Sequence, residues 1–123
     1  MINSLKLQNI RVTLFIDPKL SDIKIAKELG ADCVEIHTGK YCNAFNSKKN
    51  IKKHFLNIKK AAQYSKYKNL EVHAGHGLTY KSVINISKIQ QISEFNIGHF
   101  IISESIFCGL KNSIKKFKKI INK

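Results

Sequence analysis

The sequence predicts an α/β fold in which the strands of one parallel sheet alternate with helices. Four apolar runs rich in β-branched and aromatic residues recur along the 123-residue chain, which is typical of buried strands. Each run is followed by a segment whose apolar residues recur at helical spacing. Strands joined by helices form right-handed βαβ units, and such units build a parallel sheet. The length is enough for one small domain with its own core.

The composition argues against several broad classes of protein. A hydrophobic fraction of 43% is too high for a disordered chain, and no run of about eighteen apolar residues is available to cross a membrane. The first residues lack the apolar core of a secretory signal. Cys33, Cys42 and Cys108 are odd in number and widely spaced, so they predict neither a disulfide framework nor a zinc site. We therefore expect free thiols, a cytoplasmic location, no metal and no cofactor.

The net charge of +14 raises the alternative of a basic module that binds nucleic acid or anionic lipid. Arginine is the usual residue for bidentate phosphate contacts, yet Arg11 is the only arginine of the chain. The lysines are spread over every expected helix instead of lining one face. We interpret them as a solvated coat, and we expect neither a specific nucleic acid nor a membrane as partner.

The first strand is expected over residues 11–16, with the sequence R-V-T-L-F-I. Asp17 and Pro18 end this strand, because proline suits the first turn of a following helix. Either Asp17 or Ser21 is placed to cap that helix, and Gly30 is a typical signal for its C-terminal end.

The second strand is expected over residues 33–37, with the sequence C-V-E-I-H. Glu35 and His37 alternate with apolar residues, so they point to one face of the sheet while Val34 and Ile36 point to the other. Residues 40–47 exceed a simple turn and are expected to form a mobile loop over a site. A long helix is expected over residues 48–67, with one apolar stripe and one lysine-rich side.

The second half of the chain repeats the alternation. A third strand is expected over residues 70–74, with a glycine-rich exit loop at residues 75–79, and a helix over residues 82–92. A fourth strand is expected over residues 95–102, with Gly98 and His99 embedded in it, and glycine inside a strand often marks close approach of a ligand. Residues 103–107 are expected to form a short connection or a helical turn, and residues 110–121 a final helix.

Ligand-type side chains gather where these strands end. Gly75 and Gly77 flank His76, and glycine lets the backbone take positive φ and lets a ligand approach closely. The other chemically active side chains at or near strand ends are Glu35, His37 and His99. The residues leave two architectures open, an open four-stranded sheet and half of an eight-stranded barrel. The C-terminal strand ends form the active face of such a barrel, which favours the second architecture.

Five motifs occur in an order and spacing that together identify a family. They are V-T-L-F-I-D at residues 12–17, E-I-H-T-G at 35–39, A-G-H-G-L-T-Y at 74–80, N-I-G-H at 96–99 and G-L-K at 109–111. In these motifs the chain closely resembles the pyridoxine 5′-phosphate synthase family, whose C-terminal half it matches over almost its whole length. The resemblance implies the (β/α)8 TIM-barrel fold, with residues 1–123 forming a C-terminal half-barrel of about four βα units.

The resemblance also implies an activity and a role for five residues. Family members condense 1-deoxy-D-xylulose 5-phosphate with 3-amino-2-oxopropyl phosphate, giving pyridoxine 5′-phosphate, phosphate and water in vitamin B6 biosynthesis. By this likeness His76 is the proton donor and Glu35 stabilises the transition state. The positions matching the binding site for the amino-ketone phosphate are Gly77, Gly98 and His99.

The chain departs from the family pattern in ways that bear on activity. The N-terminal half of the family, with further catalytic residues, has no counterpart here, so we expect an enzyme half that works with a separate N-terminal half chain. Family members assemble into octamers, which implies a homo-oligomer. The alternative is an inactive remnant of a broken gene. His73 stands where the family usually has Asn. Ser103 and Glu104 replace a Gly-Arg or Ala-Arg pair, and this acidic replacement near a phosphate-binding strand suggests weaker substrate binding or relaxed selection.

Overall fold

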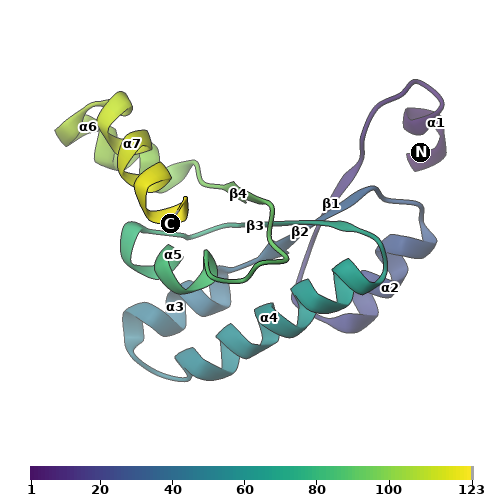
Figure 1. The fold of residues 1–123 in the computed structure, drawn as a ribbon, viewed down its shortest axis with the longest axis horizontal. Coiled ribbons are helices and arrows are strands. Elements are labelled where there is room, and N and C mark those ends of the chain that lie inside the picture. The colour runs from purple at the N-terminus through teal and green to yellow at the C-terminus, as the bar shows by residue number, and fades with distance from the viewer. Residues whose placement is uncertain (123) are drawn as a thin grey trace.

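The computed structural model describes residues 1–122 of the chain (Figure 1). Strands and helices alternate through most of it. In chain order the elements are α1 (Ile2–Lys6), β1 (Thr13–Ile16), α2 (Leu20–Glu28), β2 (Cys33–His37), α3 (Gly39–Ser47), α4 (Ile51–Tyr67), β3 (Glu71–Gly75), α5 (Tyr80–Ile86), β4 (Glu94–Asn96), α6 (His99–Cys108) and α7 (Leu110–Ile121).

The four strands form one parallel sheet in the order β1-β2-β3-β4. Each strand therefore lies beside the strand before it in sequence, and each connection crosses over through a helical segment. Within residues 1–122, β1 and β4 each pair on one side only, which leaves two open edges of the sheet. The predicted α/β fold with a parallel sheet is confirmed.

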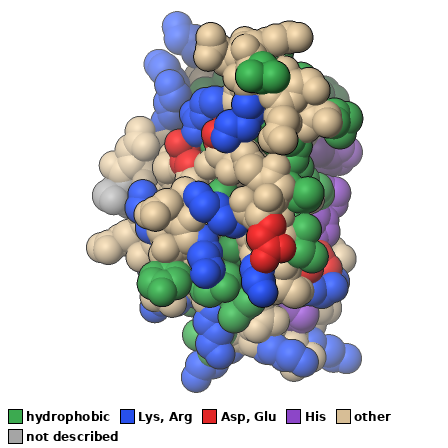
Figure 2. Space-filling view, turned by 90° about the vertical axis from the view of Figure 1, so that its right-hand side faces the viewer, with side chains coloured by type: hydrophobic (Ala, Val, Ile, Leu, Met, Phe, Trp, Pro, Cys, Tyr) green, Lys and Arg blue, Asp and Glu red, His purple; other side chains and the backbone are tan. Residues whose placement is uncertain are grey.

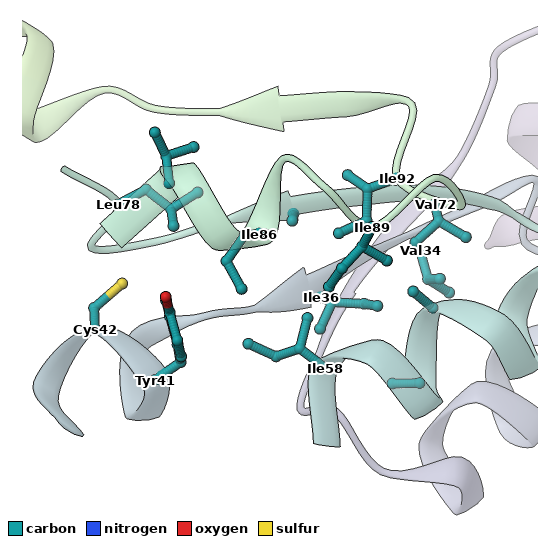
Figure 3. Close-up of a cluster of buried hydrophobic side chains, with 14 of the residues drawn as sticks. Val34, Ile36, Tyr41, Cys42, Ile58, Val72, Leu78, Ile86, Ile89 and Ile92 are labelled. Carbon is teal, nitrogen blue, oxygen red and sulfur yellow. The ribbon is translucent and has the colours of Figure 1, made fainter. Parts of the chain in front are cut away.

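One face of this sheet is covered by helices. Figure 1 shows α2, α3, α4 and α5 on the same side of the strands. Val34, Ile36 and Val72 point to that side and are at most 1% exposed. Figure 3 shows them facing Ile58 of α4 and Ile86 of α5, so the hydrophobic core lies between the sheet and these helices.

The other face, here called the open face, carries polar and aromatic side chains. Alternation along the strands places on it Thr13, Phe15, Cys33, Glu35, His37, Glu71, His73, Glu94 and Asn96. Burial on this face is incomplete, since Phe15 is 54% exposed while His73 is 6% exposed. The hydrophobic effect therefore fixes the helix-covered face, and hydrogen bonds and charges organise the open face.

The C-terminal end of α2 is as expected, whereas the capping residue expected at its N-terminal end is wrong. Gly30 has φ 83°, and the N–H groups of Gly30 and Ala31 donate to Lys27 O and Ala26 O, which is the Schellman arrangement that ends a helix. Neither Asp17 nor Ser21 caps the other end, because the N-cap residue is Lys19 and no side chain bonds there. The Asp17 carboxylate instead accepts a hydrogen bond from Lys40.

The loop expected over residues 40–47 is wrong, because these residues lie in helix α3. Tyr41, Cys42 and Ala44 are buried, and their spacing places all three on the side of the helix that faces the core. Tyr41 also donates a hydrogen bond to Ser82 O, which ties α3 to α5. Packing of this short apolar stripe outweighed the weak helix propensity of its asparagines and glycine.

The long fourth strand expected over residues 95–102 is also wrong. β4 has three residues, and Gly98 is the N-cap of helix α6, whose first residue is His99. The expected connection at residues 103–107 lies within α6. Phe100 stacks edge-on against Tyr80, with ring centroids 5.0 Å apart, and so anchors the first turn of α6 to α5. A run of apolar β-branched residues cannot by itself distinguish a buried strand from such a helix.

The helix expected over residues 82–92 begins earlier and ends sooner, as α5. Thr79 and Ser82 form a capping box, in which each side chain accepts a hydrogen bond from the other residue's backbone N–H. After Ile86 the chain turns, and Ile89 and Ile92 remain buried without belonging to a helix. The helices expected over residues 48–67 and 110–121 are confirmed as α4 and α7, and the three cysteines are free, as expected.

Lysine side chains do not form one continuous patch on the face that Figure 2 displays. They are separated there by hydrophobic and uncharged side chains. Among the described residues, no helix is both long enough and apolar enough to span a bilayer.

Replacement of Ile58 by Ala should lower the free energy of unfolding by about 2–5 kcal/mol, because the cavity forms in the middle of the core. Ile84→Ala is the matched control, since Ile84 also lies on a helix but is 45% exposed, whereas Ile58 is 1% exposed. We expect the control to change the free energy by less than about 0.5 kcal/mol. Urea unfolding measures both, and equal losses would contradict the assignment of the core.

Candidate active site

One cleft of about 610 Å³ opens where the strands end. It is lined at the ends of β1, β2 and β4 and along the loop that follows β3. All five predicted site residues line this cleft, namely Glu35, His76, Gly77, Gly98 and His99. The structure thus brings together residues that are up to 64 positions apart, from Glu35 to His99. Their chemical roles stay predictions.

Glu35 is held in place by its neighbours in the sheet. Its Oε2 accepts a hydrogen bond of 2.7 Å from Asn96 Nδ2, so β4 orients a carboxylate of β2 across the intervening strand. Between them lies Gly75 of β3. A Cβ at Gly75 would collide with Glu35 Oε1 and would lie 2.9 Å from Asn96 O. Only glycine fits there without moving the carboxylate.

His76 takes a backbone conformation that few residues adopt. Its φ is 78°, in the left-handed region, where side chains other than glycine are strained by about 1–2 kcal/mol. The hydroxyl of the buried Thr38 lies 2.7 Å from His76 O and 2.8 Å from Gly75 O, so its one hydrogen is shared between the two carbonyl oxygens. This contact holds the turn, and the imidazole consequently projects into the cleft as an exposed side chain.

A second histidine lies directly against His76. The ring centroids of His37 and His76 are 4.5 Å apart, and Phe15 packs edge-on against His37 at 5.0 Å. His37 Nδ1 is buried without a hydrogen-bond partner among the described residues, and Asp17 Oδ1 is 3.7 Å away, too far for a hydrogen bond. The His37 ring is therefore held against the His76 ring by packing contact.

Two pKa shifts follow from this packing. Burial, together with the nearby His76, lowers the pKa of His37 below its ordinary value of 6.5, because both disfavour the cationic imidazolium. The hydrogen bond from Lys40 lowers the pKa of Asp17. Next to His76 there is consequently a neutral His37 imidazole, beside an Asp17 carboxylate that stays ionised at neutral pH.

The far side of the cleft is suited to an anion. Gly98 begins the ten-residue helix α6, no side chain caps that end, and the backbone N–H groups of its first turn are available beside the cleft. A Cβ at Gly98 would meet nothing within 4 Å, so space for a ligand remains there. Gly77 has φ 81°, and a Cβ would lie 3.2 Å from Cys42 Cβ.

Several residues that shape the site were not predicted. Phe15, Asn96 and Thr38 contact or orient the predicted residues, although all three lie within the motifs of the sequence analysis. Alternation along paired strands was the signal that could have found Phe15 and Asn96, because they face the same side as Glu35. Ser103 and Glu104, two departures from the family pattern, lie in α6 and do not line the cleft.

Thr38→Val should destabilise the chain by about 1–3 kcal/mol, because it removes the hydroxyl donor of the Gly75 and His76 carbonyls at nearly unchanged side-chain volume. Thr38→Ser keeps the hydroxyl and is the control, for which a smaller loss is expected. Urea unfolding measures the stability, and the backbone NMR shifts of His76 report its φ. If valine and serine behaved alike, the hydroxyl would not be what holds the turn.

The lowered pKa of His37 predicts a pH dependence of stability. The unfolded chain takes up a proton at His37 near pH 6.5 while the folded chain resists it, so the unfolded state binds more protons and stability falls as the pH drops below about 6.5. Urea midpoints measured between about pH 7.5 and about pH 5.5 should decline more steeply for the natural chain than for His37→Gln. Parallel curves would contradict this account of His37.

Comparison with known proteins gives a consistent result over the whole chain. Residues 1–123 match the family model described as "Pyridoxal phosphate biosynthesis protein PdxJ". The pyridoxine 5′-phosphate synthase of Pelagibacter ubique is 56% identical over 116 residues, which are 94% of this chain and 48% of the relative. Those of a Sulfurihydrogenibium species and of Zymomonas mobilis are 52% and 47% identical over 98% and 92% of this chain, and 49% and 43% of their own lengths.

The chain spans about half the length of the curated relatives that it matches. The family model nevertheless covers all of its 123 residues, and the identity to full-length relatives is high. The cleft motifs quoted from the sequence lie within the matched region. The chain therefore belongs to the pyridoxal phosphate biosynthesis protein PdxJ family.

Proposed function

We propose that this chain is the C-terminal half of a pyridoxine 5′-phosphate synthase, condensing 1-deoxy-D-xylulose 5-phosphate with 3-amino-2-oxopropyl phosphate to give pyridoxine 5′-phosphate, phosphate and water. The observation that carries the proposal is the single cleft at the strand ends, which Glu35, His76 and His99 line together. The relatives are named pyridoxine 5′-phosphate synthases, which supports the same reaction.

The fold supports a half-barrel within a (β/α)8 barrel, with residues 1–123 as its four C-terminal βα units. Helices cover one face of the sheet, as in a barrel, whereas a doubly wound open sheet has helices on both faces. The open face and the unpaired edges of β1 and β4 are the surfaces that four further strands would cover. We propose that a separate N-terminal half chain supplies them.

His76 is proposed as the proton donor of the reaction. Ring closure expels hydroxyl and phosphate groups, which leave more readily when an acid protonates them. The imidazole of His76 is exposed in the cleft, and histidine is the side chain that enzymes use most often for proton transfer. The strained turn fixed by Thr38 aims this ring and limits its freedom before substrate arrives.

Glu35 is proposed to stabilise positive charge that develops on imine intermediates. Its carboxylate is partly buried and oriented by Asn96, so little reorganisation is needed when charge appears. The glycine at position 75 leaves Oε1 its space. Asp17 does not line the cleft and accepts a hydrogen bond from Lys40, so it does not compete for this role.

Phosphate is proposed to bind at the start of α6. Gly98 leaves the first-turn N–H groups of a ten-residue helix open toward the cleft, and His99 adds an imidazole donor. Gly77 lies across the cleft from them in a conformation that brings backbone close to the ligand. These groups fit the phosphate of the amino-ketone substrate.

We also propose a homo-oligomer and a cytoplasmic location. Exposed apolar side chains on α6 support a contact with another copy of the chain, since Ile106 and Phe107 are 79% and 88% exposed. The three free cysteines support a reducing compartment.

The proposal is tested by mixing this chain with the N-terminal half of the Pelagibacter ubique relative and assaying pyridoxine 5′-phosphate. The stoichiometric complex should turn over, and each half alone should not. His76→Gln should lower kcat by about 10²–10⁴-fold through loss of the general acid. Glu35→Gln should lower it by about 10²–10³-fold through loss of the charge.

His54→Gln is the matched control, because His54 lies on α4 and does not line the cleft. We expect it to leave turnover unchanged. A folded stoichiometric complex without turnover would favour the alternative of an inactive remnant. Turnover that survives His76→Gln would remove His76 from the role of proton donor.

A further inference from the structure

A second cluster of ligand-type side chains lies on the open face, toward the opposite end of the sheet from the cleft. Cys33 begins β2, Glu71 begins β3, and His73 follows two residues later on the same side. The Cys33 thiol, a Glu71 carboxylate oxygen and a His73 ring nitrogen all lie within 4.8 Å of one another. None of these three lines the cleft, so the proposed reaction does not use them.

We propose that Cys33, Glu71 and His73 form a binding site for one zinc ion. Thiolate, imidazole and carboxylate are the three side-chain ligands that zinc takes in proteins. At bond lengths of about 2.0–2.3 Å, ligand atoms around a tetrahedral ion are about 3.3–3.8 Å apart. The three ligand atoms lie within 4.8 Å of one another, so movements of about 1 Å or less bring them to the separations of a tetrahedral site. The fourth position is left for water.

The environment of His73 matches that of a metal ligand. Its Nε2 faces Glu71 Oε1 at 2.9 Å, on the side where the ion would bind. Its Nδ1 faces Glu94 Oε1 at 3.6 Å on the other side. Histidines that bind metals usually direct their second ring nitrogen to a carboxylate, which fixes the tautomer and orients the ring. The present separation of 3.6 Å is longer than a hydrogen bond, so Glu94 of β4 would move closer to His73 to play that part when the ion binds.

The burial of these side chains also indicates a preformed site and not an incidental proximity of mobile surface groups. Cys33 and His73 are 1% and 6% exposed, so two of the three ligands are shielded from water and restricted in rotamer. The Glu71 side chain is 40% exposed and gives the ion a path of entry. Each ligand lies on a strand of the same sheet, and the pairing of Cys33 with Glu71 fixes their separation.

A cation already occupies part of this site in the structure. Arg11 Nη2 lies 2.8 Å from Cys33 Sγ and forms an ion pair with Glu71 Oε2. The Arg11 side chain is 62% exposed, so it can swing away at little cost when a metal arrives. Charges then balance. The Cys33 thiol releases its proton to solvent, and the thiolate and the Glu71 carboxylate neutralise Zn²⁺.

The test uses the full 123-residue chain, stripped of metal with a chelator. Calorimetric titration with Zn²⁺ should give one site per chain, and zinc should raise the thermal unfolding midpoint. Co²⁺ in place of zinc should give a thiolate charge-transfer band in the near ultraviolet. Cys33→Ser should abolish that band, and His73→Asn should weaken zinc binding by more than about 100-fold. Glu94→Gln should weaken it by about 10–100-fold.

Matched controls separate this site from other thiols and histidines. Cys108→Ser removes the exposed thiol and His54→Gln removes a helical histidine, and both should keep the affinity and the band. Circular dichroism checks the fold of each variant, and His73→Asn decides the matter if Cys33→Ser does not fold. The proposal is overturned if the natural chain does not bind zinc, or if His73→Asn binds it as tightly as the natural chain.

Discussion

The parallel pairing of β2 with β3 is the constraint on which both ends of the open face depend. It sets Cys33 beside Glu71, Glu35 beside His73 and His37 beside Gly75. A slip of one residue in either strand would turn that strand's polar side chains toward the core, where Val34, Ile36 and Val72 now lie. The apolar face therefore fixes the register, and the register in turn places the polar groups. Packing on one side of the sheet determines the chemistry on the other.

Within the cleft, the orientation of Glu35 on β2 depends on residues of both β3 and β4. Glu35 can keep its orientation only because Gly75 has no side chain and Asn96 provides the donor. The same Gly75 precedes His76, whose positive φ redirects the chain out of the sheet and into the cleft. Thr38, at the end of β2, closes this arrangement through its hydroxyl. The strain at His76 is thus tolerated because buried hydrogen bonds surround it, which is the usual condition for strain at a functional site.

Much of the fold could be predicted, because apolar periodicity and helix-end signals act over short distances. Three strands, the helix α4 and the Schellman end at Gly30 required only local information. Helix α3 and the break after β4 required tertiary information. Tyr41 and Cys42 become helical through packing against elements that follow much later in the chain. Phe100 packs against Tyr80 and Phe117, and these contacts stabilise its place in α6. The periodicity of a single sequence cannot detect such contacts.

The candidate site likewise has some features that the local sequence predicts and others that depend on tertiary contacts. His76 with its two glycines, and Glu35 in its alternating strand, could be selected from residue type and spacing, and their family motifs added specificity. The support given by Thr38, Asn96 and Phe15 could not be predicted from residue type and spacing, since each acts through a partner on another strand or loop. The cluster of Cys33, Glu71 and His73 was missed for a related reason. The spacing of the cysteines in the sequence does not reveal this cluster. Cys33 gains its possible ligand partners only through strand pairing with Glu71, 38 positions away.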